Sequence, residues 1–65
     1  MIDIWKFHDS DKIKLTDTDR NVYIGNVVIV DDAEETGDPE DGITIYVEGR
    51  YLGFLQSEIA EIQEL

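Results

Sequence analysis

Apolar residues in this chain occur only in short runs, and polar clusters rich in Asp, Asn, Ser and Gly separate one run from the next. The longest run, residues 22–30, is rich in β-branched side chains, which favour an extended strand. No run approaches the about 20 apolar residues of a membrane-spanning helix. We therefore expect a small fold of short strands joined by turns, with no membrane segment.

Three further runs are predicted to be strands. Residues 12–15 and 43–47 alternate polar and apolar side chains, which is the period of a half-buried strand. Residues 51–55 follow after the tight turn 48–50, so the last two runs predict a β-hairpin. Gly25, inside the longest run, predicts a bulge or a sharp bend. Four strands with short turns indicate a small antiparallel barrel.

The two ends of the chain are expected to add small pieces to this barrel. Asp3 is a candidate cap for one helical turn that presents Trp5 and Phe7 to the barrel. Segment 57–65 has apolar residues spaced three apart, which fits a helix that Ser57 would cap. An isolated helix of this length is weak in water, so the choice between helix and strand stays open here.

Two polar segments are predicted to be loops. Residues 16–21 predict a turn, because Asp and Asn side chains bond their own backbone. Residues 31–42 hold seven carboxylates and no basic residue, which predicts a solvated acidic loop. This loop does not match an EF-hand, because Thr36 stands where Gly is required and Gly42 where Glu is required. We expect no metal and no other cofactor.

The chain of 65 residues is expected to form a single domain, 1–65, with a marginal core. A domain this short hides only about 60% of its unfolded surface. Because the chain has no Cys, no disulfide can reinforce it, and partner subunits are one remaining support. The predicted core consists of Ile13, Leu15, Ile24, Val28, Val30, Ile43, Ile45, Leu52, Phe54 and Ile59.

The charge balance limits the partners of this chain. Sixteen acidic residues oppose five basic ones, for a formal net charge of −11. A charge of this sign disfavours binding to nucleic-acid phosphates and to anionic lipid. The first residues carry an early acid and lack the continuous apolar run of a secretion signal, so we expect a cytoplasmic protein.

The sequence contains no constellation of residues that indicates catalysis. His8 is the only histidine, and it is the one candidate base for Ser10 or Ser57. Short polar turns commonly contain such residues without any catalytic role. We therefore expect no enzyme activity.

The order of these features resembles the Sm-like (LSm) family of small SH3-like barrels, over roughly residues 12–62. The first family motif is an alternating strand, a polar turn and a Gly-containing apolar strand that ends in Asp. Residues 12–15, 17–21 and 25–31 stand in those places. The second motif matches residues 52–62, which in the family form strand four, a tight turn and a short fifth strand. The resemblance implies a five-stranded antiparallel barrel.

The chain departs from the family where its RNA-binding members contact RNA. Those members carry Met-Asn or an equivalent after the loop-three Asp, and Arg-Gly before strand five. Glu34 and Glu35 stand at the first place, with Glu35 near the position of the base-stacking Asn, and Gln56 and Ser57 stand at the second. The resemblance therefore implies a member that has lost both sets of RNA contacts.

The resemblance also implies a homo-oligomer, because Sm-like subunits pair strand four of one chain with strand five of the next. The candidate self-association residues are Tyr51, Leu52, Gly53, Phe54, Leu55, Ile59 and Ile62. We expect a non-enzymatic module for protein interaction or assembly. Two alternatives stay open: an atypical RNA-binding ring, which requires a concentrated basic surface, and an acidic mimic of nucleic acid that binds a basic protein.

Overall fold

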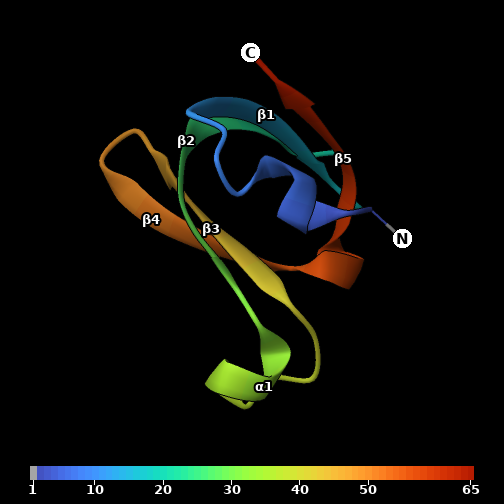
Figure 1. The fold of residues 1–65 in the computed structure, drawn as a ribbon. Helices are drawn as coiled ribbons and strands as arrows, with labels where there is room; N and C mark the ends of the chain where they lie inside the picture. Colours follow the sequence, from blue (N-terminus) through green and yellow to red (C-terminus); the bar gives the residue numbers. More distant parts are fainter. Residues whose placement is uncertain (1) are drawn as a thin grey trace.

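The computed structural model describes residues 2–65 and shows five strands in one antiparallel sheet (Figure 1). The strands are β1 (Lys12–Asp17), β2 (Val22–Asp31), β3 (Gly42–Val47), β4 (Arg50–Leu55) and β5 (Ile59–Glu64). Their order in the sheet is β4-β3-β2-β1-β5, so four strands follow one another as a meander and β5 returns to β1. The prediction of a small, five-stranded, antiparallel barrel-like fold is confirmed.

Three short helical pieces complete the fold: η1 (Ile4–Phe7), α1 (Ala33–Thr36) and η2 (Gln56–Glu58). The carboxylate of Asp3 caps η1 by accepting the backbone N–H of Trp5 at 3.1 Å, as predicted. The prediction that Trp5 faces the barrel is wrong, because Trp5 is 39% exposed and Ile4 is buried instead. A 3₁₀ turn has three residues per turn, so Ile4 and Phe7 share the inner side and Trp5 does not.

The two predicted turns are confirmed, with longer strands on either side. The carboxylate of Asp17 accepts the backbone N–H groups of Asp19 and Asn21 at 2.9 and 2.8 Å, which closes the turn between β1 and β2. The β3–β4 hairpin has two turn residues, Glu48 (φ 47°) and Gly49 (φ 83°). Two successive positive φ angles define a type I′ turn, which matches the twist of the flanking strands.

The acidic segment 31–42 is shorter and more regular than predicted. Asp31 belongs to β2 and Gly42 to β3, and the helical turn α1 lies between them. Asp32 caps α1 by accepting the backbone N–H of Glu34 at 2.8 Å, and Gly37 ends it with a φ of 77°. An Asp before a helix and a left-handed Gly after it are the ordinary signals for helix ends, and both are present in this sequence.

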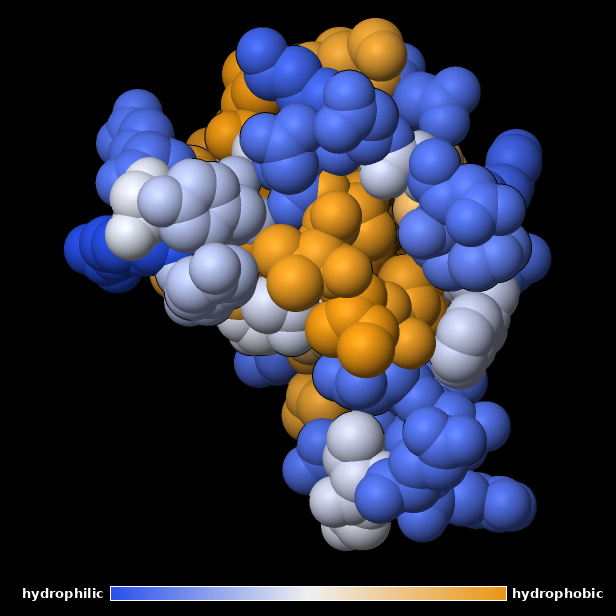
Figure 2. All heavy atoms as spheres, turned by 60° about the vertical axis from the view of Figure 1, so that its left-hand side comes forward, coloured by the Kyte–Doolittle hydropathy of each residue, from blue (hydrophilic) through white to orange (hydrophobic). Residues whose placement is uncertain are grey.

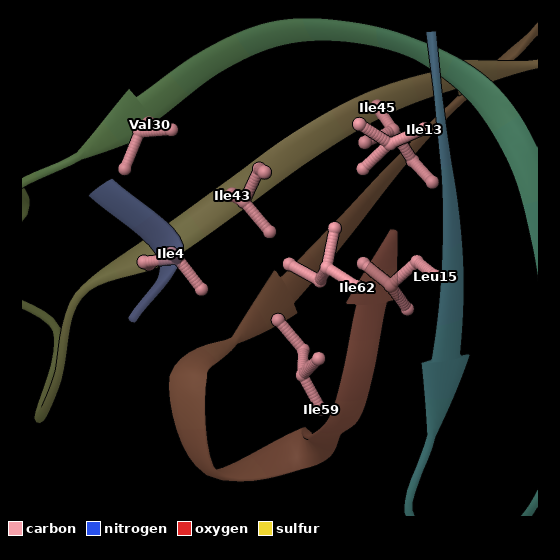
Figure 3. Close-up of a cluster of buried hydrophobic side chains, with 8 residues drawn as sticks. All are labelled: Ile4, Ile13, Leu15, Val30, Ile43, Ile45, Ile59 and Ile62. Carbon is pink, nitrogen blue, oxygen red and sulfur yellow. The ribbon is translucent and has the colours of Figure 1, made fainter. Parts of the chain in front are cut away.

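Eight aliphatic side chains from η1 and four of the strands form the core (Figure 3). They are Ile4, Ile13, Leu15, Val30, Ile43, Ile45, Ile59 and Ile62. Leu52 and Phe54 of β4 are half-buried and pack against this cluster. The prediction that Ile24 and Val28 are core residues is wrong, because each is 49% exposed.

A β-bulge in β2 explains the error. Val27 pairs with Ile45 and Ile29 pairs with Thr44, which leaves Val28 without a partner on β3. An extra residue reverses the alternation of faces along the strand. Before the bulge, the odd-numbered residues of β2 therefore face inward. After the bulge, an even-numbered residue, Val30, faces inward.

A second register shift settles the conformation of the C-terminal segment, which is a strand. Asp17 pairs with Ile59 and Thr16 pairs with Glu61, so Ala60 is the extra residue. Because the bulge reverses the alternation, Ile59 and Ile62 both face the core although they are three residues apart. The three-residue spacing that suggested a helix comes from this bulge.

Gly25 lies at an inward, buried position of β2, three residues before the bulge. A Cβ atom at this position would lie 2.2 Å from the carbonyl oxygen of Tyr46 and 2.7 Å from a methyl carbon of Val47. The neighbouring strand β3 therefore approaches so closely here that only glycine fits, while the bulge of β2 lies at Val28 and not at Gly25.

Candidate interaction surface

The two outermost strands, β4 and β5, form the edges of the sheet. Each has a hydrogen-bonded neighbour on one side, and within residues 2–65 the two do not pair with each other. Figure 1 shows the opening of the sheet between them, with β4 in orange and β5 in red. An edge strand presents unpaired N–H and C=O groups that a strand from another molecule can pair.

The predicted self-association residues differ in exposure along these edges. Tyr51 is 70% exposed and Gly53 is also exposed, whereas Leu52, Phe54 and Leu55 are half-buried. Ile59 and Ile62 are core residues, so only their backbone is available to another molecule. The predicted residues therefore lie on the two outer strands, and their role in self-association stays a prediction.

The two edges carry opposite charges. Strand β4 contains Arg50 and no acidic residue, whereas β5 contains Glu61 and Glu64 and no basic residue. Within the described chain no Lys or Arg is paired with a carboxylate, so these three charges have no ionic partner in a single copy. Glu64 accepts one hydrogen bond, from the hydroxyl of Ser10 at 2.5 Å. The charges at both edges are thus available to another molecule.

A groove of about 440 Å³ opens beside the start of β4. Its apolar lining includes Val22, Ile24, Val47 and Leu52, and Glu48 and Arg50 are its charged residues. Arg50 therefore lies at the edge of the sheet and beside a partly apolar groove.

The outer face of the sheet carries an apolar patch that the sequence analysis missed. Ile24, Ile29, Tyr46 and Tyr51 share this face, and the exposure of their side chains ranges from 41% to 70%. The rings of Tyr46 and Tyr51 contact each other with centroids 5.0 Å apart. Figure 2 shows apolar atoms gathered in a band between hydrophilic margins. The signal was present in the β-branched run 22–30, which has too many apolar residues for one inward face.

The four positions that the Sm-like resemblance compares with RNA contacts lie in the short helical pieces α1 and η2. Glu34 and Glu35 are exposed on α1. The side-chain amide of Gln56 donates to the carbonyl oxygen of Ile2, and both the N–H and the hydroxyl of Ser57 donate to the carboxylate of Glu40. Gln56 and Ser57 therefore hold η2 against its neighbours, and the other two positions are negatively charged.

Asp41 connects the acidic segment to the N-terminal turn. One carboxylate oxygen accepts the indole N–H of Trp5 at 2.8 Å, and the other accepts the backbone N–H of Ala33 at 2.8 Å. The hydrogen bond from Trp5, followed by the one from Ala33, holds the pKa of Asp41 below its usual value. This carboxylate therefore acts as a structural acceptor.

Asp17 has the same role in the β1–β2 turn. Desolvation raises its pKa, but hydrogen bonds from Asn21, Asp19 and Tyr23 outweigh that effect and hold the pKa below its usual value. Both perturbed carboxylates are thus explained by hydrogen bonds that shape a loop.

The candidate catalytic and metal-binding residues do not converge. The ring of His8 contacts the carbonyl oxygen of Trp5 and the carboxylate of Asp9, whereas Ser10 and Ser57 donate to Glu64 and Glu40. Across residues 2–65, no three Asp, Glu or His side chains lie close enough together to hold a metal ion. The same residues include no helix that is long and apolar enough to cross a membrane.

Comparison with protein-family models, with curated proteins and with solved structures finds no match to this chain. Its class is therefore defined by its fold alone: a small all-β protein whose five-stranded antiparallel sheet is open between β4 and β5.

Proposed function

We propose that this chain is a non-enzymatic, Sm-like assembly module whose copies join through strands β4 and β5. The observation that carries the proposal is the open sheet, in which both edge strands are six residues long and lack a partner on one side. Pairing β4 of one copy with β5 of another would continue the sheet and satisfy both edges.

The size of the core supports assembly. Eight buried aliphatic side chains are a small core, and Leu52 and Phe54 of β4 remain only half-buried in a single copy. Covering them against another copy removes apolar surface from water, which stabilises the folded state of both copies.

Electrostatic repulsion opposes assembly, because each copy carries a net charge of −11. At about 0.15 M salt this repulsion is screened beyond about 8 Å. Much of the negative charge belongs to α1 and its flanking residues, which project from the body of the sheet at the bottom of Figure 1. The positions of Glu34 and Glu35 support a protein partner over RNA, since a carboxylate repels phosphate.

Sedimentation velocity over a range of protein concentrations and salt concentrations tests this proposal. We expect species larger than the 7.4 kDa monomer, and we expect association to strengthen as salt rises, because screening weakens the repulsion between copies. A monomer at every concentration and every salt level would refute assembly and leave the fold assignment unaffected.

A further inference from the structure

We infer that the outer face of the sheet along β2 binds an amphipathic helix of a partner protein, and that this helix carries acidic residues beside its apolar stripe. The side chains of this face point away from the core, so the surface is separate from the strand edges that the proposed assembly uses. A single copy presents this face whether or not it self-associates.

The outward positions of β2 break the usual pattern of an antiparallel sheet, in which one face packs on the core and the other carries polar residues. The outward residues of β1 follow that pattern, and they are Lys12, Lys14 and Thr16. On β2, by contrast, Val22, Ile24 and Ile29 point outward, and 49% to 52% of each is exposed. Contiguous exposed apolar side chains mark an interaction surface.

The dimensions of this apolar strip fit a helix. Residues 22–29 span about 20 Å of strand, which about 14 residues of α-helix cover. Neighbouring strands are about 4.8 Å apart, so β1 and β3 lie about 10 Å apart on either side of β2. An α-helix with its side chains is about 10–12 Å wide. A helix laid along β2 would therefore rest between the lysines of β1 and Tyr46 of β3.

The charges beside the strip select an acidic helix. Lys14 lies directly opposite Ile24 in the β1–β2 ladder, and Lys12 lies opposite Asn26. Residues in direct cross-strand positions are about 5 Å apart, so both lysines border the strip on its β1 side. Within residues 2–65 neither lysine is paired with a carboxylate. Asp or Glu on the flank of the helix that faces β1 would supply the missing partners.

This local charge is opposite in sign to that of the whole chain. The net charge of −11 favours basic partners in general, yet residues 12–16 and 22–30 contain no acid. Seven carboxylates belong instead to segment 31–42, whose helix α1 projects from the body of the sheet (Figure 1). General repulsion is screened beyond about 8 Å at about 0.15 M salt, whereas the attraction of the two lysines acts at contact.

A second copy of this chain fits the strip less well than a partner helix does. The helical pieces described within residues 2–65 are only three or four residues long, too short to cover it. Stacking the outer faces of two copies would cover the apolar side chains. It would bring no carboxylate to Lys12 or Lys14 from the strip, because residues 22–30, 42–47 and 50–55 contain no acid.

A designed peptide tests the inference. The probe is a helical peptide of about 14 residues with a leucine stripe flanked by Glu, titrated into ¹⁵N-labelled protein and followed by two-dimensional NMR. We expect resonance shifts at Lys12, Lys14, Ile24 and Tyr46, and little change in segment 31–42. A peptide with Lys in place of Glu is the control, and we expect it to shift segment 31–42 instead. The absence of shifts at millimolar Glu peptide, or shifts confined to segment 31–42, would overturn the inference.

Variants of the protein separate the two parts of the recognition. We expect Lys14→Glu to weaken binding of the Glu peptide roughly tenfold. Lys6→Glu on η1 makes the same change in net charge, from −11 to −13, and is expected to weaken binding less than about twofold. Ile24→Ser keeps the charge and removes an apolar contact, and we expect a loss of at least about tenfold. Equal effects of Lys14→Glu and Lys6→Glu, or full binding by Ile24→Ser, would overturn the inference.

Other occupants of the strip give different results. If two copies stack through it, Ile24→Ser loses self-association in sedimentation velocity. If it binds a membrane or RNA, vesicles of anionic lipid or oligo-U produce the shifts at Lys14 and Ile24. Either result without binding of the Glu peptide would overturn the helix. A monomeric chain that binds the Glu peptide along β2 would refute the proposed assembly and support this inference.

Discussion

Several carboxylates of this acidic chain serve as acceptors for nearby N–H groups, and Asp41 is the clearest case. It accepts the indole N–H of Trp5, which is 36 positions away in the chain, and the backbone N–H of Ala33, which is 8 positions away. Such bonds favour the ionised form, so the same contacts that lower the pKa of Asp41 also link its ionisation to the stability of the fold.

The sign of this linkage gives a prediction for pH. Because the pKa of Asp41 is lower in the folded state, its contribution to stability is present above the ordinary value of 3.8 and is lost as pH falls through the lowered pKa. We expect Asp41→Asn to lower Tm at pH 7, with the difference from wild type shrinking below about pH 4. Thermal melts followed by circular dichroism measure both quantities.

Asp38→Asn is the matched control for this experiment, since it removes the same charge from the same segment and no hydrogen bond to the Asp38 carboxylate is described within residues 2–65. A Tm deficit of Asp41→Asn that stays constant down to the lowest pH would contradict the linkage.

Gly25 leads to a prediction about steric fit. A methyl group on Gly25 would overlap the carbonyl oxygen of Tyr46, which is backbone and cannot rotate away. We expect Gly25→Ala to lower the free energy of unfolding by about 1–3 kcal/mol or more, measured by urea denaturation. Gly53→Ala is the control, because its Cβ would meet only the Thr44 hydroxyl at 3.9 Å. Equal stability of Gly25→Ala and Gly53→Ala would show that the sheet relaxes at this point.

Among the elements, bulges mark the boundary between what the sequence predicts and what it does not. Alternating and β-branched runs were sufficient to predict β1 to β4, because burial of one face imposes a period of two. The bulges at Val28 and Ala60 are not visible in that pattern, since each arises from pairing with a strand distant in sequence. Ile24 was therefore assigned to the wrong face, and segment 57–65 was compatible with a helix.

Two other elements carried signals that were present but ambiguous. Asp32 and Gly37 flank α1 as its cap and its terminator, yet the seven carboxylates of segment 31–42 indicated a solvated loop more strongly. Ile4 is buried because η1 is a 3₁₀ turn, in which residues three apart share one side. A segment of only four residues does not show from its sequence whether it forms a 3₁₀ turn or an α-helical turn.

The β5 bulge leads to a prediction about adjacent positions. Ile62 is 7% exposed and belongs to the core, whereas Gln63 faces outward. We expect Ile62→Ala to cost about 2–5 kcal/mol of unfolding free energy and Gln63→Ala to cost less than about 0.5 kcal/mol. If Ile62→Ala is unfolded at room temperature, Ile62→Val, with an expected cost of about 0.5–1.5 kcal/mol, gives a measurable transition. Equal effects at positions 62 and 63 would contradict the inward orientation of Ile62.

For the molecule as a whole, the edge strands of the candidate surface followed from the family resemblance, but its apolar patch did not. The outer patch includes Ile24 and Ile29 of β2, and the bulge at Val28 is what places an even-numbered and an odd-numbered residue of this strand on the same face. The net charge of −11 follows directly from the sequence. That Arg50 lies at one edge of the sheet and Glu61 and Glu64 at the other is known only from the strand order in the structure.

The net charge leads to a prediction about RNA. We expect no measurable affinity for single-stranded RNA at physiological salt, because the phosphate backbone meets net repulsion and the positions of the family RNA contacts hold Glu34, Glu35, Gln56 and Ser57. Fluorescence anisotropy with labelled oligo-U and oligo-A measures this, and a lysine-rich peptide verifies that the probes respond. Micromolar binding that weakens steeply with salt would instead favour the RNA-binding alternative.

The opening of the sheet between two unlike edges gives each copy a head and a tail. In polymer terms, every such monomer joins a growing chain in the same orientation, head to tail. Growth ends only when the chain closes into a ring or when its ends are capped. On the proposed pairing, a copy that keeps β5 and loses the function of β4 is a chain terminator. Small amounts of such a copy would shorten open chains in proportion to its mole fraction, whereas preformed closed rings would admit it only as fast as they exchange subunits.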